Sequence, residues 1–367
     1  MTKKEEKIKK EEKALENKCP SCNASIKFNP TAGKWKCDYC ASSFTLEEMQ
    51  KYTNASSKEN NEKEKLKEID NTDYTSYKCQ SCGAEIIADE QTAATFCVYC
   101  GNTAILKSKL SGKFSPDKII PFKQEKEKAI LAFKGLSKGR PLMPSDFNNT
   151  NNIEKIRGIY IPFWIYDMSV SGDVNFSAKQ IDSWTRGDTH YTKTSIYKIY
   201  RSGSMNYHGI PVDASTRFNN DIMNTIEPFD YNEFQDYNHA FLSGFYAEKY
   251  DIDGIAAFAE AEKRALESSK NIMLNDAMGY VEKVVTENTL DANQLKRQYA
   301  LLPVWMVNVK YNEKQYLFAM NGQTGEFVGN IPLDKRKTVI YTILIYIITF
   351  IVCIIGSYIL YKIGGNA

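Results

Sequence analysis

Eight of the nine cysteines fall into two clusters of identical spacing, a pattern typical of metal binding. In each cluster two Cys-x2-Cys pairs are separated by 14 residues, and the second cluster lies 60 positions after the first: Cys19, Cys22, Cys37 and Cys40, then Cys79, Cys82, Cys97 and Cys100. Each pair places two thiolates on one tight turn, and two such turns complete a tetrahedral sulfur site suited to Zn²⁺. The spacing therefore predicts two tandem zinc ribbons, each with one structural Zn²⁺.

Modules this small cannot bury enough apolar surface to fold alone, so the metal is expected to supply folding free energy, on the order of 10 kcal/mol. The two clusters also match between their cysteines, which favours a duplication: Ala24, Ile26 and Tyr39 correspond to Ala84, Ile86 and Tyr99.

Other chemistry on the same cysteines is less well supported. A disulfide framework needs an oxidising compartment, and the chain opens with the charged run MTKKEEKIKK rather than an apolar signal sequence. A redox Cys-x-x-Cys centre needs a βαβ context, and four protein ligands leave no open position for catalytic zinc. An iron centre on the same ligands stays open as an alternative.

The second informative segment is an uncharged apolar run from Thr338 to Tyr361. As a helix its 24 residues would extend roughly 36 Å, enough to cross a hydrocarbon core of roughly 30 Å. Tyrosines lie near both ends, where interfacial aromatic residues are expected. The basic residues Lys335, Arg336 and Lys337 precede the run, so the positive-inside rule predicts a single-pass protein of the cell membrane with its N-terminal domains in the cytoplasm.

One stripe of this expected transmembrane helix is smaller or more polar than its surroundings and is spaced by four and three residues: Thr342, Tyr346, Thr349, Cys353 and Gly356. Such stripes allow close approach of a second helix, so pairing with a membrane partner or a second copy is one interpretation. The other interpretation is that a simple membrane anchor tolerates small residues at these positions by chance.

Composition between these segments indicates six parts: a charged tail at 1–17, the first ribbon at 18–48, a polar linker at 49–76, the second ribbon at 77–108, an α+β body at 109–333 and the transmembrane helix at 338–361. The linker suggests that the ribbons move partly independently, with a short helix at 58–69 as an option. The formal net charge is +2, and two Zn²⁺ sites with four thiolates each would make it −2, so charge does not favour a polyanion-binding protein.

The body alternates between helical and extended periodicity, which predicts an α+β fold with antiparallel strands. Helices are expected at 123–137 and 253–274, the second with Asp253 as N-cap and an apolar stripe formed by Ile255, Phe258, Ala259, Ala265, Leu266 and Ile272. Strands are expected at 158–170, 192–201, 278–287, 301–311, 315–320 and 326–329, with a turn between the last two. The motifs Ile161-Pro162-Phe163-Trp164-Ile165 and Leu302-Pro303-Val304-Trp305-Met306 share a pattern, which predicts strands opened by proline with tryptophan on the core face. They suggest either that the body consists of two duplicated halves or that two strands share this pattern by coincidence.

No catalytic motif stands out. The three histidines are scattered, and a triad of His208, Asp213 and Ser215 lacks the strand-turn-helix elbow that such a serine needs. A turn in which Asp213 and Ser215 bond to nearby backbone amides is the better interpretation. Neither a phosphate-binding loop nor a dinucleotide-binding turn occurs in the sequence. We therefore expect a protein that is not an enzyme.

The ribbons and five motifs of the body resemble bacterial double-zinc-ribbon proteins with a single membrane span. The motifs are Ile120-Pro121-Phe122, Tyr160-Ile161-Pro162-Phe163-Trp164, Ile210-Pro211-Val212-Asp213, Leu302-Pro303-Val304-Trp305 and Asn321-Gly322-Gln323-Thr324-Gly325. This family is described as containing transcription-factor-B-type zinc ribbons, and some members occur beside phage-shock protein A systems. The resemblance implies recruitment of membrane-stress proteins and carries no catalytic residues.

Two functions follow as hypotheses. The first is a membrane-anchored adaptor or scaffold that assembles proteins at the membrane. The second is a membrane-tethered nucleic-acid-binding protein that uses the ribbons, where Trp35, Tyr39, Phe96 and Tyr99 would stack on bases. The ribbons lack the several basic residues that phosphate binding requires, and aromatic residues near zinc usually form a small core, so the adaptor is favoured.

Overall fold

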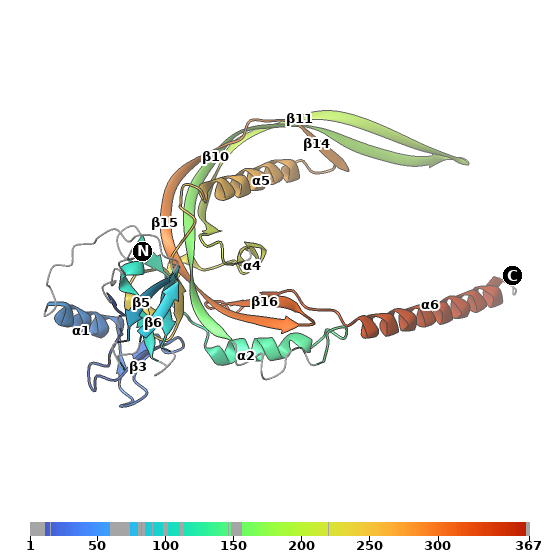
Figure 1. Ribbon diagram of the computed structural model, residues 1–367. Helices are drawn as coiled ribbons and strands as arrows, with labels where there is room; N and C mark the ends of the chain where they lie inside the picture. Colours follow the sequence, from blue (N-terminus) through green and yellow to red (C-terminus); the bar gives the residue numbers. More distant parts are fainter. Residues whose placement is uncertain are drawn as a thin grey trace, which may run out of the picture.

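The computed structural model describes residues 12–14, 16–58, 74–79, 82, 85–89, 91–97, 102–110, 114–145, 147, 156–218 and 220–364. It is a mixed α+β structure with a long, strongly curved sheet of mainly antiparallel strands at its centre (Figure 1). The short strands that carry the cysteines lie beside this sheet, on the left in Figure 1, and the C-terminal helix extends away to the right, beyond β16 (Figure 1).

The N-terminal part consists of short strands and one helix: β1 Glu12–Lys13, β2 Lys27–Asn29, β3 Lys34–Lys36, β4 Ser43–Phe44, α1 Leu46–Lys58, β5 Tyr74–Lys78, β6 Glu85–Asp89, β7 Thr92–Phe96, β8 Thr103–Ile105 and the 3-10 turn η1 Lys107–Leu110. Strands β2, β3 and β4 form one antiparallel sheet, and β1, β5 and β6 form another. Helix α1 begins in a capping box, because Thr45 Oγ1 accepts from the Glu48 amide at 3.4 Å and Glu48 Oε2 accepts from the Thr45 amide at 2.8 Å. The helix occupies the first part of the segment that the sequence indicated as a linker, and the optional helix at 58–69 lies almost wholly outside the described residues.

The body contains the remaining elements: β9 Lys118–Ile119, α2 Lys126–Lys134, η3 Gly135–Ser137, β10 Arg157–Arg186, β11 Thr189–Asp213, α4 Asn220–Thr225, η4 Tyr231–Glu233, β12 Gln235–Asp236, η5 His239–Leu242, β13 Tyr246–Glu248, α5 Phe258–Asp276, β14 Glu282–Asn288, β15 Asp291–Tyr311, β16 Lys314–Asn321, β17 Phe327–Gly329 and α6 Lys335–Gly364. The six strands expected from the sequence lie within β10, β11, β14, β15, β16 and β17, apart from a few terminal residues. Strand β10 lies between β11 on one side and β14 and β15 on the other, all antiparallel to it.

The sheet bends because its strands contain breaks in register and glycine pairs. The pairing of β10 with both neighbours shifts just before Met168, where a bulge strengthens the local twist. Gly172 then faces Gly203 across the hairpin and has φ +140°, and a Cβ there would lie 2.5 Å from the Thr289 carbonyl oxygen. Only glycine fits this close approach of two backbones.

Helix α5 fills the concave side of the curved sheet (Figure 1). Most side chains on its buried face are small, and this face consists of Ala261, Ala265, Ser269 and Met273. Tyr207 of β11 lies 2.7 Å from the Ser269 hydroxyl, and Arg264 donates to the Pro211 carbonyl oxygen and pairs with Glu227. Small side chains therefore allow the helix to approach the sheet closely.

Two details of this helix differ from the sequence prediction. It begins at Phe258, and Asp253 accepts from the Ile255 amide in the preceding turn rather than capping the helix. Of the predicted apolar stripe, Ala265 is buried and Phe258 and Leu266 pack against the core as expected. Ile255, Ala259 and Ile272 are exposed, so that part of the prediction was wrong. Tertiary packing determines that Ser269 is buried while Ile255 and Ile272 are exposed, and the periodicity of the sequence does not reveal this.

The two Pro/Trp motifs lie in neighbouring strands of one sheet rather than in separate halves. Pro162 is paired with Leu301 and Pro303 with Tyr160, well inside β10 and β15, so the prolines do not open the strands. Both tryptophans are buried as expected. Trp305 joins Phe122, Tyr160 and Phe245 in one aromatic cluster, so these motifs form the core.

The Asn321–Gly325 turn is a hub of buried hydrogen bonds. The Asn321 side chain donates to the Ile226 and Pro228 carbonyl oxygens and accepts from the Gln323 and Thr324 amides. A Cβ on Gly322 would lie 2.7 Å from the Phe122 ring. This motif therefore holds together three segments of the body.

Candidate metal centres

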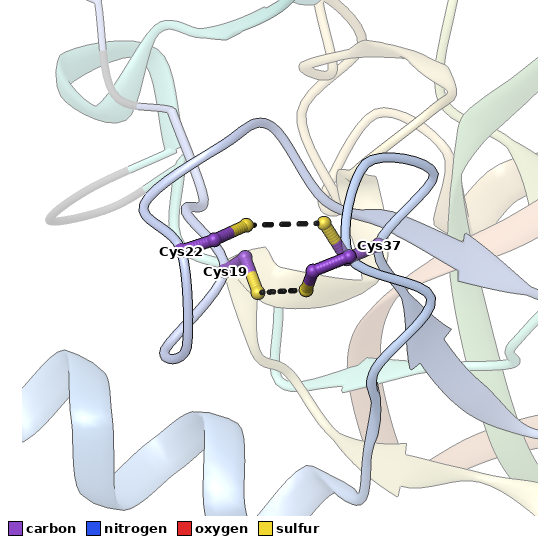
Figure 2. Close-up of side chains that lie close together, drawn as sticks. Cys19, Cys22 and Cys37 are labelled. Carbon is purple, nitrogen blue, oxygen red and sulfur yellow. Dashed lines mark hydrogen bonds between the residues drawn. The ribbon is translucent and has the colours of Figure 1, made fainter.

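The first cysteine cluster forms a compact group of four sulfur atoms. Their Sγ atoms all lie within 4.8 Å of one another: Cys19, Cys22, Cys37 and Cys40. Figure 2 shows the Cys22 and Cys37 side chains pointing toward each other, at a sulfur-sulfur distance of 3.6 Å. The Cys19 and Cys40 sulfurs are also 3.6 Å apart.

These distances fit metal ligands better than a bond between sulfurs. A disulfide requires a separation of about 2.0 Å. Four thiolates at about 2.3 Å from one tetrahedral ion would lie roughly 3.8 Å apart. The arrangement is therefore compatible with a metal ion at the centre of the four sulfurs.

Two turns with the same backbone pattern hold the four sulfurs. The Cys19 amide donates to the Ala24 carbonyl oxygen at 2.7 Å, and the Asn23 amide donates back to the Cys19 carbonyl oxygen at 2.9 Å. In the second turn the Cys37 amide donates to Ser42 and the Ala41 amide to Cys37, at 2.9 and 3.0 Å. Asn23 and Ala41 both have φ near +60°, which closes each turn.

The local electrostatics favour a thiolate at one ligand. Cys40 Sγ lies 3.3 Å from the Ser42 hydroxyl, and hydrogen bonding with that hydroxyl and the Ser42 amide lowers the pKa of Cys40 to about 6. Deprotonated sulfur is the form that binds metal.

The second cluster repeats this geometry in the part that the structure describes. The sulfurs of Cys79, Cys82 and Cys97 lie within 4.8 Å of one another, and Cys82 and Cys97 are 3.7 Å apart. The Cys97 amide donates to the Asn102 carbonyl oxygen at 2.9 Å, as the Cys37 amide does to Ser42. The predicted fourth ligand, Cys100, lies outside the described residues, as do Ala84 and Tyr99.

The first module, residues 17–49, is fastened to the body. Trp35 is fully buried, its indole N–H donates to the Ala240 carbonyl oxygen at 2.8 Å, and its ring packs with Phe28 and Phe241. Asn17 donates to the Ser243 hydroxyl at 2.7 Å. The expected partial independence of this module therefore differs from the structure. At the end of the charged tail, Ala14, Glu16 and Asn17 are buried.

The second module shares strands with the body. Strand β7 pairs with β13 at Ala94 and Ala247, and β13 in turn pairs with β10. Half of the module is therefore part of the large sheet. The Phe96 ring packs on Tyr246 at 4.8 Å, while Tyr39 of the first module is 84% exposed. Of the aromatic residues considered for base stacking, only Tyr39 is shown open to solvent among those described.

The histidine, aspartate and serine of the hypothetical triad are not brought together. His208 is exposed and lies 3.8 Å from Asp167, whereas Asp213 is buried and its Oδ1 accepts from the Ser215 amide at 3.0 Å. The turn interpretation is therefore confirmed.

The other oxygen of Asp213, Oδ2, is buried without a hydrogen-bond partner among the described residues. Burial raises the pKa of Asp213 to about 7, and the charges of Asp251 and Glu248 add to this effect. In the unfolded chain the pKa returns to its ordinary value near 3.8. Between these values the folded state holds the extra proton, so this group makes the free energy of unfolding fall as pH rises toward 7.

We expect Asp213→Asn to be more stable than the unmodified protein at pH 8.5 and similar to it at pH 4, where the carboxyl group keeps its proton in both the folded and the unfolded chain. The amide keeps the Oδ1 acceptor and cannot ionise, and each pKa unit corresponds to about 1.4 kcal/mol. Thermal unfolding in detergent at both pH values measures the effect. Asp291→Asn, at an exposed position, serves as control, and an equal gap between Asp213→Asn and the unmodified protein at both pH values would contradict the assignment.

Helix α6 contains the apolar run that the sequence predicts to be a transmembrane helix. Its segment Lys335–Ser357 is long and apolar enough to cross a membrane, and none of its most apolar window is buried in the described structure. Asp334 caps the helix by accepting from the Arg336 and Lys337 amides, and its own amide donates to the Leu142 carbonyl oxygen at 2.8 Å. The Lys337 ammonium donates to the Met143 carbonyl oxygen at 2.8 Å, so the first turn is fixed to the body.

Together these features define an α+β protein with two cysteine clusters compatible with metal binding and one C-terminal helix that could span a membrane. The chain is 32% identical over 311 residues to the uncharacterized protein YdjG of Bacillus subtilis strain 168, an alignment that covers 71% of this chain and 91% of YdjG. It belongs to the same family as YdjG. No family model and no solved structure matches it.

Proposed function

We propose that this protein is a membrane-anchored cytoplasmic adaptor whose two zinc ribbons and α+β body recruit or assemble other proteins at the membrane. In this proposal both zinc ions are structural, no reaction is catalysed, and the six sequence segments act as one anchored unit. The resemblance to zinc-ribbon proteins found beside phage-shock protein A systems favours a role in the envelope stress response.

The proposal takes the metal to be zinc because four cysteine sulfurs at tetrahedral spacing form a closed soft-ligand site, of the kind that structural zinc occupies. Iron can occupy the same four sulfurs, and elemental analysis distinguishes the two metals. A cytoplasmic position is favoured by the three basic residues before the apolar run, Lys335, Arg336 and Lys337. The reducing cytoplasm would also keep the ligands as thiolates.

The observation that carries the adaptor proposal is the exposed turn of the first module. Tyr39 lies between the ligands Cys37 and Cys40 and is 84% exposed, on a turn that the metal site and Trp35 make rigid. The module lies at the end of the molecule opposite α6, away from the anchor (Figure 1). A rigid, exposed aromatic side chain is a typical anchor for protein recognition.

Photo-cross-linking tests this proposal. With a benzoylphenylalanine in place of Tyr39, illumination of intact cells should give discrete protein adducts, whereas the same substitution at Met278, an equally exposed residue of the body, should not. Adducts at Tyr39 that are nuclease-sensitive, with micromolar, steeply salt-dependent binding to DNA by the purified protein, would favour the nucleic-acid alternative. Absence of protein adducts at Tyr39 would contradict the adaptor proposal.

Pairing of the transmembrane helix through Thr342, Tyr346, Thr349, Cys353 and Gly356 remains part of the proposal. The Thr342 and Thr349 hydroxyls donate to carbonyl oxygens one turn earlier in α6, each at 2.8 Å. The stripe would therefore act through close packing at Gly356 rather than through free hydroxyl donors.

A further inference from the structure

We propose that the tip of the β10/β11 hairpin is a second membrane contact, which inserts its aromatic and aliphatic side chains into the anionic lipid surface of the bilayer that holds α6. This inference rests on the proposed anchoring by α6 and adds a second contact to it.

Among the residues that the structure describes, none covers the apolar side chains at the hairpin tip. Strand β14 ends at the pair Lys179 and Glu282, and beyond it the described structure has only β10 and β11, paired out to Arg186 and Thr189. A two-stranded ribbon is marginally stable in water without a face to pack against. An unsupported ribbon of this length therefore suggests a partner outside the chain.

The exposed side chains are the kind that lipid interfaces favour. Trp184 and Tyr191 are paired across the hairpin, with parallel rings 5.7 Å apart, and are 48% and 42% exposed. Both residue types are enriched where hydrocarbon meets headgroups. Ile181 and Ile196 are 48% and 67% exposed.

These groups lie on both faces of the ribbon, which distinguishes lipid from a protein partner. Side chains alternate between faces along a strand, so Ile181 lies on the face opposite Trp184. A protein surface or a second copy would cover one face and leave the other in water. A lipid layer surrounds an inserted tip on both sides.

Charge and position support the same partner. Residues 179–198 contain four basic and two acidic side chains: Lys179, Arg186, Lys193 and Lys198, against Asp182 and Asp188. Basic residues near an anionic leaflet are attracted to its negative surface potential. The hairpin and α6 also extend from the body toward the same side (Figure 1), and α6 is fixed to the body by Asp334 and Lys337.

Fluorescence quenching by brominated lipids tests the inference with the full chain. The protein has four tryptophans, and Trp35, Trp164 and Trp305 are buried, so subtracting the emission of Trp184→Phe from that of the unmodified protein isolates Trp184. In vesicles of phosphatidylethanolamine and phosphatidylglycerol brominated in the upper acyl chain, the isolated Trp184 emission should lose most of its intensity. Arg186→Glu combined with Lys193→Glu should restore much of it.

Unchanged Trp184 emission in protein that floats with the vesicles would overturn the inference and leave anchoring by α6 intact. Protein that does not float would contradict the anchoring, and the inference would fall with it. Quenching that is the same when phosphatidylcholine replaces phosphatidylglycerol would overturn the anionic-lipid assignment. A blue shift of Trp184 emission without quenching would show burial by protein and also overturn it.

Discussion

Replacing Cys37 with serine is expected to reduce the bound metal from two equivalents per chain to one and to destabilise the body as well as the first module. The Cys37 sulfur is one of four that lie within 4.8 Å of one another, and a serine hydroxyl would bind poorly to a metal ion that prefers soft sulfur ligands. Metal binding contributes on the order of 10 kcal/mol in small zinc modules. Because Cys37 and Trp35 belong to the same buried core as Phe241 and Phe245, the loss should extend into the body.

Elemental analysis of the purified protein and its thermal unfolding in detergent measure both effects, and the former also distinguishes zinc from iron. Cys353→Ser is the matched control, because this cysteine lies in α6 outside both clusters and should keep two equivalents. Full metal content in Cys37→Ser would exclude the proposed ligand set. A metal loss with an unchanged unfolding midpoint would instead show that the first module folds independently of the body.

Truncation of Trp35 to alanine should lower the free energy of unfolding by about 3–5 kcal/mol, a typical value for a large aromatic residue removed from a core. The side chain is fully buried, donates to the Ala240 carbonyl oxygen and contacts Phe28 and Phe241. Its removal leaves a cavity between the first module and the body and removes one of the two hydrogen bonds that the Ala240 carbonyl oxygen accepts, the other coming from the Ser243 amide.

Chemical denaturation in detergent, with metal present throughout, measures this loss. Trp35→Phe keeps most of the packing and loses the hydrogen bond, so its effect should be intermediate. Leu131→Ala, at an exposed position of α2, should change stability little. An equally small effect of Trp35→Ala would contradict the contact between module and body.

Features with a local sequence signal could be predicted. The spacing of the cysteines sets which sulfurs can meet, since each pair closes its own turn. The apolar run of α6 is long enough to be recognised as a candidate membrane span from its length alone. The strands around Trp164 and Trp305 were placed correctly because their apolar and β-branched residues lie together in sequence.

The curvature of the sheet could not be predicted in the same way. The stretch around Gly172 resembles a turn, and the sequence placed the end of one strand there. In the structure β10 continues through it to Arg186, because Gly172 lies against Gly203 and the Thr289 backbone. A glycine has the same appearance in sequence whether it ends a strand or bends one.

The attachment of the cysteine modules also lacked a local signal. Asn17 and Trp35 bind residues that lie more than 200 positions later in the chain. The segment around Ala240 contains no repeat or motif that identifies it as a docking site. The capping box of Thr45 and Glu48 could have been found, since its Thr-x-x-Glu pattern is written in the sequence.

If α6 spans the membrane as proposed, its hydrogen bonds to the segment 142–145 couple the orientation of the helix to that of the body. A helix joined by a loose tether would leave the remainder of the molecule free to swivel above the bilayer. Here the Asp334 amide and the Lys337 ammonium hold the first helical turn to the Leu142 and Met143 carbonyl oxygens. Any tilt of α6 would therefore be passed on as rotation of the body, and the cysteine modules, on the side of the molecule away from this helix, would be displaced along the membrane surface (Figure 1).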